Sequence, residues 1–226
     1  MPPLSVTEAV RARRSVRAFL DTPVPLSTLR EVLELAARAP SGGNLQPWWI
    51  HVVTGEPLSR LREQMRERIA SQGPDPAEYE IYPPHPRAPY RTRRFELGEI
   101  MYAALGIPRT DKLGRLQRFA ENYQLFGAPV GLFCFIDRRM GSAQWSDLGM
   151  YLQTVMLLLK ERGLDSCAQE AWSAYHRVVT EFVKSPPELM LFCGMAIGYA
   201  DPEVPVNAIE SPRAPLDEFA RFHGFE

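Results

Sequence analysis

The chain has only three cysteines, which lie far apart and include no Cys-x-x-Cys pair. An odd number of isolated cysteines argues against a disulfide framework, and the missing ligand spacing argues against a zinc site. The four histidines show no helical pairing and no carboxylates in a metal-binding pattern. The sequence therefore predicts neither a disulfide-stabilised fold nor a protein-bound metal centre.

Long hydrophobic runs and a strong net charge are also missing. No apolar stretch reaches the roughly 18 residues that a membrane-spanning helix needs, and the first residues lack the regions of a signal peptide. The formal net charge is −1 for 226 residues, so no global field attracts nucleic acid or a membrane surface. We therefore expect a cytoplasmic protein without nucleic-acid or membrane partners.

Common nucleotide-binding and hydrolase signatures are absent as well. The sequence contains no Gly-x-x-x-x-Gly-Lys-Ser/Thr and no Gly-x-Gly-x-x-Gly. It also lacks the Gly-x-Ser-x-Gly elbow of serine hydrolases. If the protein binds a phosphate, arginines must therefore hold it in place of a glycine-rich loop.

Apolar periodicity predicts a fold in which helices predominate. We expect helices at 5–13, from Ser27 to before Pro40, and at 57–71, 92–105, 111–125, 144–162 and 174–183. Ser27 is expected to cap the second helix. The apolar runs at 48–53, 130–136 and 189–199 predict strands, the last two buried on both faces. Without a regular strand–helix–strand repeat, the pattern favours a single α+β domain over residues 1–226.

Two segments are rich in proline and lack periodicity. Residues 73–92 combine six prolines with three tyrosines, which excludes a regular helix or central strand and predicts a packed loop or lid. A lid or insert region is expected over about 73–125. The tail at 201–226 has too few local contacts to fold alone, so we expect it to wrap another surface such as a second subunit.

A cluster of cations follows the first predicted helix. Arg13, Arg14 and Arg17 surround the hydroxyl of Ser15. Guanidinium groups donate paired hydrogen bonds to phosphate oxygens, so this cluster is suited to a phosphate. The alternative is a solvated basic helix end, where cations complement the helix dipole.

The loop from Ala39 to Trp48 carries a second group of polar side chains. Ser41, Asn44 and Gln46 both donate and accept hydrogen bonds, which suits a polar sugar chain or the edge of a heterocycle. The alternative is that Ser-Gly-Gly-Asn simply forms a favourable turn.

The order of these motifs resembles the FMN-dependent nitroreductase family. The resemblance rests on Arg13-Arg14-Ser15-Val16-Arg17 and Pro40-Ser41-Gly42-Gly43-Asn44-Leu45-Gln46-Pro47-Trp48, then Gly127-Ala128-Pro129, Asp147-Leu148-Gly149, residues 163–170, residues 194–198 and Pro212-Arg213-Ala214-Pro215-Leu216. It covers nearly the whole chain. The resemblance implies an α+β fold with a central, mostly antiparallel sheet surrounded by helices and a C-terminal tail that wraps the partner subunit.

The family implies roles for particular residues. Arg13, Ser15 and Arg17 would bind the FMN phosphate and reach toward the ribityl chain and pyrimidine ring. Arg14 would contribute its backbone and its charge, and Arg213 would return from the tail to the phosphate. Further implied flavin contacts, some to a flavin held mainly by the other subunit, are Pro40, Ser41, Gly42, Asn44, Gln46, Asn122, Gln169, Glu170 and Ser211. The glutamate at position 210 departs from members with a basic residue there.

The implied activity is an NAD(P)H-dependent reduction of nitroaromatic or quinone-like acceptors in a homodimer with FMN at its interface. Hydride would pass to the flavin N5, and the acceptor would then replace the nicotinamide in a ping-pong mechanism. No side chain need act as the acid or base. The acceptor pocket would be apolar, with Tyr123, Phe126 and Trp145 as candidates together with aromatics from residues 79–102.

Three alternatives remain open at this point. An enzyme of the same fold could carry out reductive dehalogenation, flavin breakdown or dehydrogenation of a ring. A non-catalytic protein could bind flavin without being reduced by NAD(P)H. A phosphate-binding interaction module could lack flavin altogether.

Overall fold

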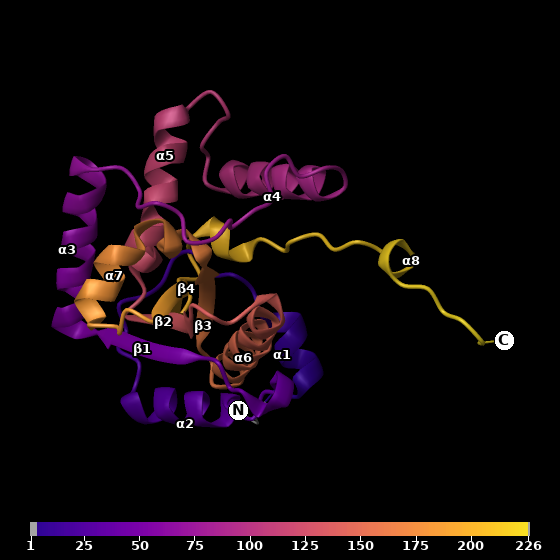
Figure 1. The fold of residues 1–226 in the computed structure, drawn as a ribbon. Coiled ribbons are helices and arrows are strands. Elements are labelled where there is room, and N and C mark those ends of the chain that lie inside the picture. Colours follow the sequence, from indigo (N-terminus) through magenta and orange to yellow (C-terminus); the bar gives the residue numbers. More distant parts are fainter. Residues whose placement is uncertain (1–3, 226) are drawn as a thin grey trace.

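The structure, a computed structural model, describes residues 4–225 and is built on a four-stranded sheet (Figure 1). The strands are β1 (Trp49–Thr54), β2 (Val130–Asp137), β3 (Asp165–Gln169) and β4 (Leu189–Gly198). Their order is β1-β2-β4-β3, and every neighbouring pair is antiparallel. The central strands β2 and β4 are almost entirely buried, as their continuous apolar sequences predict.

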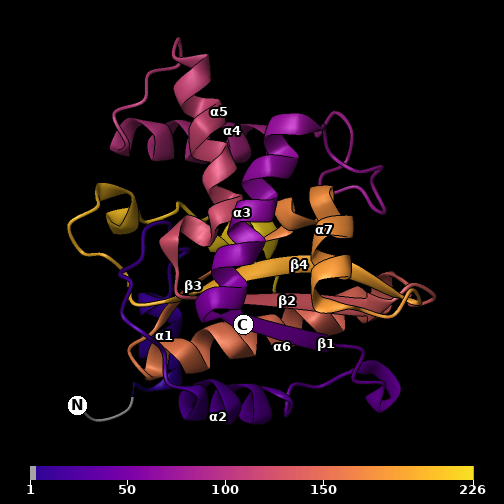
Figure 2. The same ribbon diagram turned by 90° about the vertical axis from the view of Figure 1, so that its left-hand side faces the viewer.

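Helices surround the sheet on both faces (Figures 1 and 2). The α-helices are α1 (Val6–Ala12), α2 (Leu26–Ala36), α3 (Gly55–Ser71), α4 (Tyr90–Ala104), α5 (Lys112–Ala120), α6 (Ser142–Glu161), α7 (His176–Val183) and α8 (Leu216–Phe219). Short 3-10 segments are η1 (Gly42–Asn44), η2 (Glu121–Gly127), η3 (Glu170–Tyr175) and η4 (Pro205–Ala208). In the part of the chain that is described, no helix has both the length and the apolar character needed to cross a bilayer.

Alternation along β2 divides the interior into two cores. Phe133 and Phe135 contact the cluster formed with α3, η2, η3 and α7. Leu132, Cys134 and Ile136 contact the cluster formed with α2 and α6 on the other face. Successive strand side chains point to opposite faces, so one apolar strand serves both cores. This arrangement confirms the α+β class and the sheet surrounded by helices.

Two local predictions are wrong, and one strand was not predicted. Ser27 does not cap α2, because the helix begins at Leu26 with Pro25 at the N-cap and no side-chain cap bond. The helix expected over 111–125 ends at Ala120 and continues as η2, where Leu125 and Phe126 have left-handed φ angles. Residues 165–169, for which no strand was expected, form β3 by pairing with β4.

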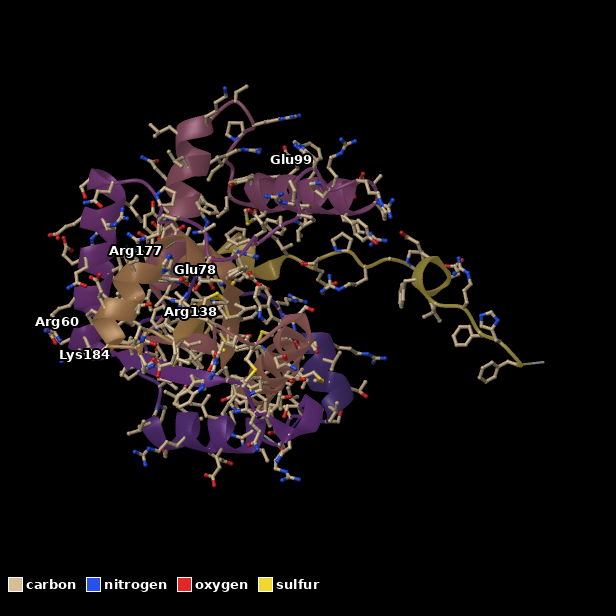
Figure 3. All side chains as sticks on the ribbon, viewed as in Figure 1. Arg60, Glu78, Glu99, Arg138, Arg177 and Lys184 are labelled. Atoms are coloured by element: carbon tan, nitrogen blue, oxygen red, sulfur yellow. The ribbon has the colours of Figure 1, made fainter. Side chains whose placement is uncertain are left out.

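The proline-rich segment between α3 and α4 has no regular element, as predicted. Its beginning is fixed to the body by two ion pairs. Asp75 accepts from Arg68 at 2.9 Å, and Glu78 pairs with Arg138 of the turn after β2 (Figure 3). Beyond it, Arg115 of α5 pairs with Glu99 of α4 at 2.6 Å.

The C-terminal tail leaves the body after η4 and extends away from the sheet (Figure 1). Its short helix α8 is linked to α4 by the ion pair between Glu218 and Arg93. The tail exposes large apolar side chains, including Phe219 and Phe222 at 69% and 67% of their surface.

Candidate functional site

A cavity of about 280 Å³ lies where the chain after α1 meets α5, η2 and the end of β3. Its walls come from segments far apart in the sequence. They include Arg17, Arg118, Phe119, Asn122, Phe126, Cys167, Gln169 and Glu170, together with Ile81 and Tyr82 of the proline-rich segment and Met101 and Tyr102 of α4. Aromatic and amide groups thus surround a space bordered by two arginines.

The segment after α1 is held at the edge of the sheet. Ser15 forms a parallel bridge with Ser166 of β3, and the Val16 amide donates to the Ser166 carbonyl at 3.1 Å. The Arg17 amide donates to Asn207 Oδ1 of η4 at 2.8 Å. These backbone contacts fix the positions of the Cα atoms from which the neighbouring arginine side chains extend.

Four arginines gather beside the cavity without carboxylate partners. The Arg118 guanidinium donates to the Arg17 carbonyl at 2.7 Å. Burial lowers the pKa of Arg13, and the positive charge of Arg213 lowers it further. Burial likewise lowers the pKa of Arg118; the charge of Glu121 raises it, and the charge of Arg17 lowers it by a smaller amount.

Among residues 4–225, none of these four guanidinium groups lies within ion-pair distance of a carboxylate. Like charges that are partly removed from water disfavour one another, as Arg13 and Arg213 do, whereas Glu121 offsets the repulsion between Arg118 and Arg17. An anion placed among them removes that penalty and gains charge-assisted hydrogen bonds. The cluster is therefore suited to a phosphate, and it contains two of the three arginines grouped in the sequence, Arg13 and Arg17, but not Arg14.

A buried amide faces the same cavity. Gln169, which is 3% exposed, donates from Nε2 to the carbonyl of Asn122 at 2.8 Å and to its Oδ1 at 3.1 Å. Gln169 Oε1 is buried and has no donor among the described residues. A buried acceptor without a partner is costly, and a rotation of the Gln169 side chain would turn this oxygen toward an N–H group of a ligand in the cavity. Glu170 follows at the cavity wall and is exposed.

Comparison with known proteins agrees with this geometry, because residues 10–199 match the nitroreductase family. The chain belongs to the nitroreductase family. It is 37% identical over 217 residues to a 4-nitrobenzoate reductase of Pseudomonas putida, covering 96% of this chain and 95% of the relative. It is 38% identical over 223 residues to a nitrobenzene nitroreductase of Ectopseudomonas oleovorans, covering 96% of both chains.

Solved structures of nitroreductases share the fold. The FMN and NADPH-dependent nitroreductase NfnB from sphigopyxis sp. strain HMH is 50% identical, with a TM-score of 0.95 over 98% of this chain and 100% of the other. The FMN-dependent NfnB from Mycobacterium smegmatis, solved in complex with NADPH, is 33% identical, with a TM-score of 0.92 over 96% and 97% of the two chains.

Other residues expected in a nitroreductase site lie away from the cavity. Arg14 directs its charge to Glu210 at 2.5 Å and not to the arginine cluster. Ser211 is exposed, and its carbonyl accepts from Arg213 at 2.9 Å. The glutamate that departs from the family pattern thus has a local partner in Arg14.

The loop at 40–46 is not among the walls of this cavity. Pro40, Gly42, Asn44 and Gln46 are exposed, and Ser41 is half-buried. Hydrogen bonds and three left-handed backbone positions define the conformation of the loop. Gly43, Asn44 and Gln46 have φ angles of 57°, 58° and 48°. The Gln46 amide donates to Ser41 Oγ at 3.0 Å, and the Gly42 amide donates to the buried Asp147 of α6 at 3.3 Å. Left-handed non-glycine residues in an exposed loop are characteristic of binding segments.

The three proposed acceptor contacts are not brought together. Phe126 lines the cavity, with the Arg118 guanidinium 5.1 Å from its ring centroid. Tyr123 is not among the walls of this cavity, and its hydroxyl donates to the Ala171 carbonyl at 3.2 Å. Trp145 lies in the core on the other face of the sheet, against Tyr79.

Arg118 is the main cavity residue that the sequence reasoning missed. It precedes Asn122 by four residues, so the helical spacing that places both on one face was the available signal. Tyr82 and Tyr102 fall within the 79–102 segment whose aromatics were expected here.

Proposed function

We propose that the protein is an FMN-dependent oxidoreductase that uses NADPH to reduce nitroaromatic compounds. The observation that carries the proposal is one cavity lined by Arg17, Arg118 and the buried amide of Gln169, with the interacting pair Arg13 and Arg213 beside it. FMN offers both complementary groups, a phosphate dianion and a ring N–H. Relatives named FMN and NADPH-dependent nitroreductase support the same assignment.

Each part of FMN has residues suited to it. Arg13, Ser15 and Arg213 would hold the phosphate, because they supply two guanidinium forks and a hydroxyl at the edge of β3. Gln169 would accept from the ring N–H through its free oxygen. Arg17 would stabilise negative charge on a ligand in the cavity.

When bound, FMN supplies the redox chemistry, accepting hydride from NADPH and passing electrons to the nitro group. The protein's own residues bind and orient. Phe126, Tyr82 and Tyr102 offer aromatic surfaces on which a flat acceptor stacks. These aromatic walls favour an aromatic acceptor.

The site is completed in a homodimer. The exposed, locally fixed loop Ser41–Gln46 would reach a flavin held mainly by the other subunit. The tail from Asp201, with its exposed phenylalanines, would wrap that subunit. Residues 73–125 would act as a lid, since Ile81, Met101 and Phe119 from this region already line the cavity.

The substrate class follows from the relatives. Those that match along almost the whole chain are named reductases of nitrobenzoate, nitrobenzene and chloronitrobenzene. An iodotyrosine deiodinase of known structure is 23% identical with a TM-score of 0.63, which reflects the shared fold alone. Nitro reduction is therefore favoured over dehalogenation.

The decisive test is an anaerobic absorbance spectrum of the purified protein before and after NADPH, followed by a nitroarene. We expect a flavin band that bleaches with NADPH and returns when nitrobenzene is added. A parallel sample with NADH measures the nicotinamide preference. A band that NADPH does not bleach would identify flavin binding without this chemistry. A colourless protein that ignores added FMN would overturn the proposal.

A further inference from the structure

A second cavity, of about 610 Å³, lies beside the first. It is formed by the end of α3 and the proline-rich segment that follows, by α5, and by residues of η2 and η3. Figure 2 shows α3 and α5 rising side by side above the sheet. Ile81, Phe119 and Ala171 line both cavities. The two spaces are therefore neighbours that share a wall, and the second is the larger.

Among the described residues that line the second cavity, none has a charged side chain. The Tyr123 hydroxyl is engaged with the Ala171 carbonyl, and burial raises its pKa, so the group stays neutral. The Ser71 hydroxyl donates to the Glu67 carbonyl at 2.7 Å. The polar groups are thus largely satisfied, and the remaining surface is aromatic and aliphatic.

Small and exposed residues leave room for a ligand in this space. Ala120, Ala171 and Ala174 line it with methyl groups only. Leu116 and Phe119 of α5 border it while exposing 65% and 50% of their surface. Exposed apolar side chains around a hollow indicate a surface that gains free energy when an apolar group covers it.

We propose that this second cavity is a subsite for the bulky apolar substituent of the nitroaromatic acceptor, whose nitro group lies in the first cavity. The inference rests on the proposed function. An uncharged lining disfavours the phosphates of FMN and NADPH, because burying a charge without a partner is costly. The shared residues Ile81, Phe119 and Ala171 join the subsite to the cavity that holds Gln169 and Arg118. The preferred acceptors are therefore nitroarenes with an aryl or branched alkyl group.

The experiment compares nitrobenzene with 4-nitrobiphenyl in Ala120→Leu and Ala174→Leu, two separate variants that each fill the subsite. Ala103→Leu is the matched control, because Ala103 is exposed on α4 and lines neither cavity. We expect kcat/KM for 4-nitrobiphenyl to fall about tenfold or more, within the range for one badly fitted group in an apolar pocket. The value for nitrobenzene should change less than about twofold, as should both values in the control.

An equal fall for both acceptors, or no fall for either, would overturn the subsite. If the two variants changed the oligomeric state but left the ratio of the two kcat/KM values unchanged, the cavity would instead be a contact surface for a second copy of the chain. Binding separates this inference from the proposed function. If the wild type reduces neither acceptor, fluorescence titration must still show tighter binding of 4-nitrobiphenyl than nitrobenzene. Ala120→Leu must remove that difference, and failure to do so rejects the subsite.

Discussion

Replacing Arg13 by glutamine is expected to weaken the binding of FMN and to leave the binding of riboflavin unchanged. The two ligands differ in the phosphate alone, so the comparison isolates the group that Arg13 is proposed to hold. A hydrogen bond to a charged group contributes about 1.5–3 kcal/mol, which corresponds to about 10- to 150-fold in Kd.

The structure places the expected effect toward the lower part of that range. Arg13 is half-buried, but Arg213, the second cation of the pair, is exposed and solvated. Part of the phosphate's charge therefore stays screened by water after Arg13 is lost. The flavin-free protein should respond in the opposite direction. Removing one of two repelling cations should leave its thermal midpoint unchanged or raise it.

The assay is titration of the flavin-free protein with FMN and with riboflavin, followed by quenching of flavin fluorescence. Arg14→Gln is the matched control, because Arg14 is adjacent in sequence but pairs with Glu210. That variant should lose less than about fivefold in FMN affinity, which corresponds to the upper value of about 1 kcal/mol for an exposed ion pair. Equal losses for FMN and riboflavin in Arg13→Gln, or an equal loss in the control, would refute the assignment of the cluster to phosphate.

Three further predictions concern the scaffold and the dimer. In Gly194→Ala the new Cβ would lie 2.4 Å from the indole of the buried Trp172, so the free energy of unfolding should fall by about 1–3 kcal/mol in urea denaturation; an unchanged midpoint would contradict this packing. In Asp75→Asn the partner of Arg68 loses its charge at a site with 2% side-chain exposure, and denaturation should show a loss of about 3 kcal/mol. A loss below about 0.5 kcal/mol, typical of surface substitutions, would mean that the pair is solvated. Truncation after Asp201 should yield monomers that release FMN on gel filtration, whereas a yellow dimer would reject the proposed role of the tail.

The sequence predicts those elements whose own apolar pattern indicates that they are buried. β2 and β4 are continuous apolar runs, and α6 is apolar around most of its circumference, so their identity does not depend on distant contacts. β3 differs, because Asp165-Ser166-Cys167-Ala168-Gln169 has little apolar pattern of its own. It becomes a strand because β4 offers it a partner, with Gln169 opposite Gly194. Strand formation of this kind is set by tertiary context.

The turn at the end of η2 depends on a similar long-range condition. Leu125 and Phe126 both have φ of 52°, a conformation that neither residue favours. Gly131 in β2 makes it possible, because a Cβ there would lie 2.6 Å from Leu125 Cδ1. The glycine inside an apolar strand was the visible signal, but its partner lies in another element. Packing thus overrides the helical periodicity that predicted a continuous helix to residue 125.

The arginine cluster shows both the reach and the limit of local reasoning. Arg13, Arg14 and Arg17 were grouped because they are neighbours in sequence, yet the backbone at Arg13 is extended and Ser15 is paired as in a strand. Extended backbone turns successive side chains to opposite sides, so Arg14 faces Glu210 while Arg13 faces the tail arginine. Arg118 takes its place in the cluster, reaching Arg17 from 101 residues away. The residues of a phosphate site in this fold therefore depend on the side to which each side chain at the sheet edge points. Cations that are adjacent in the sequence identify only part of the site.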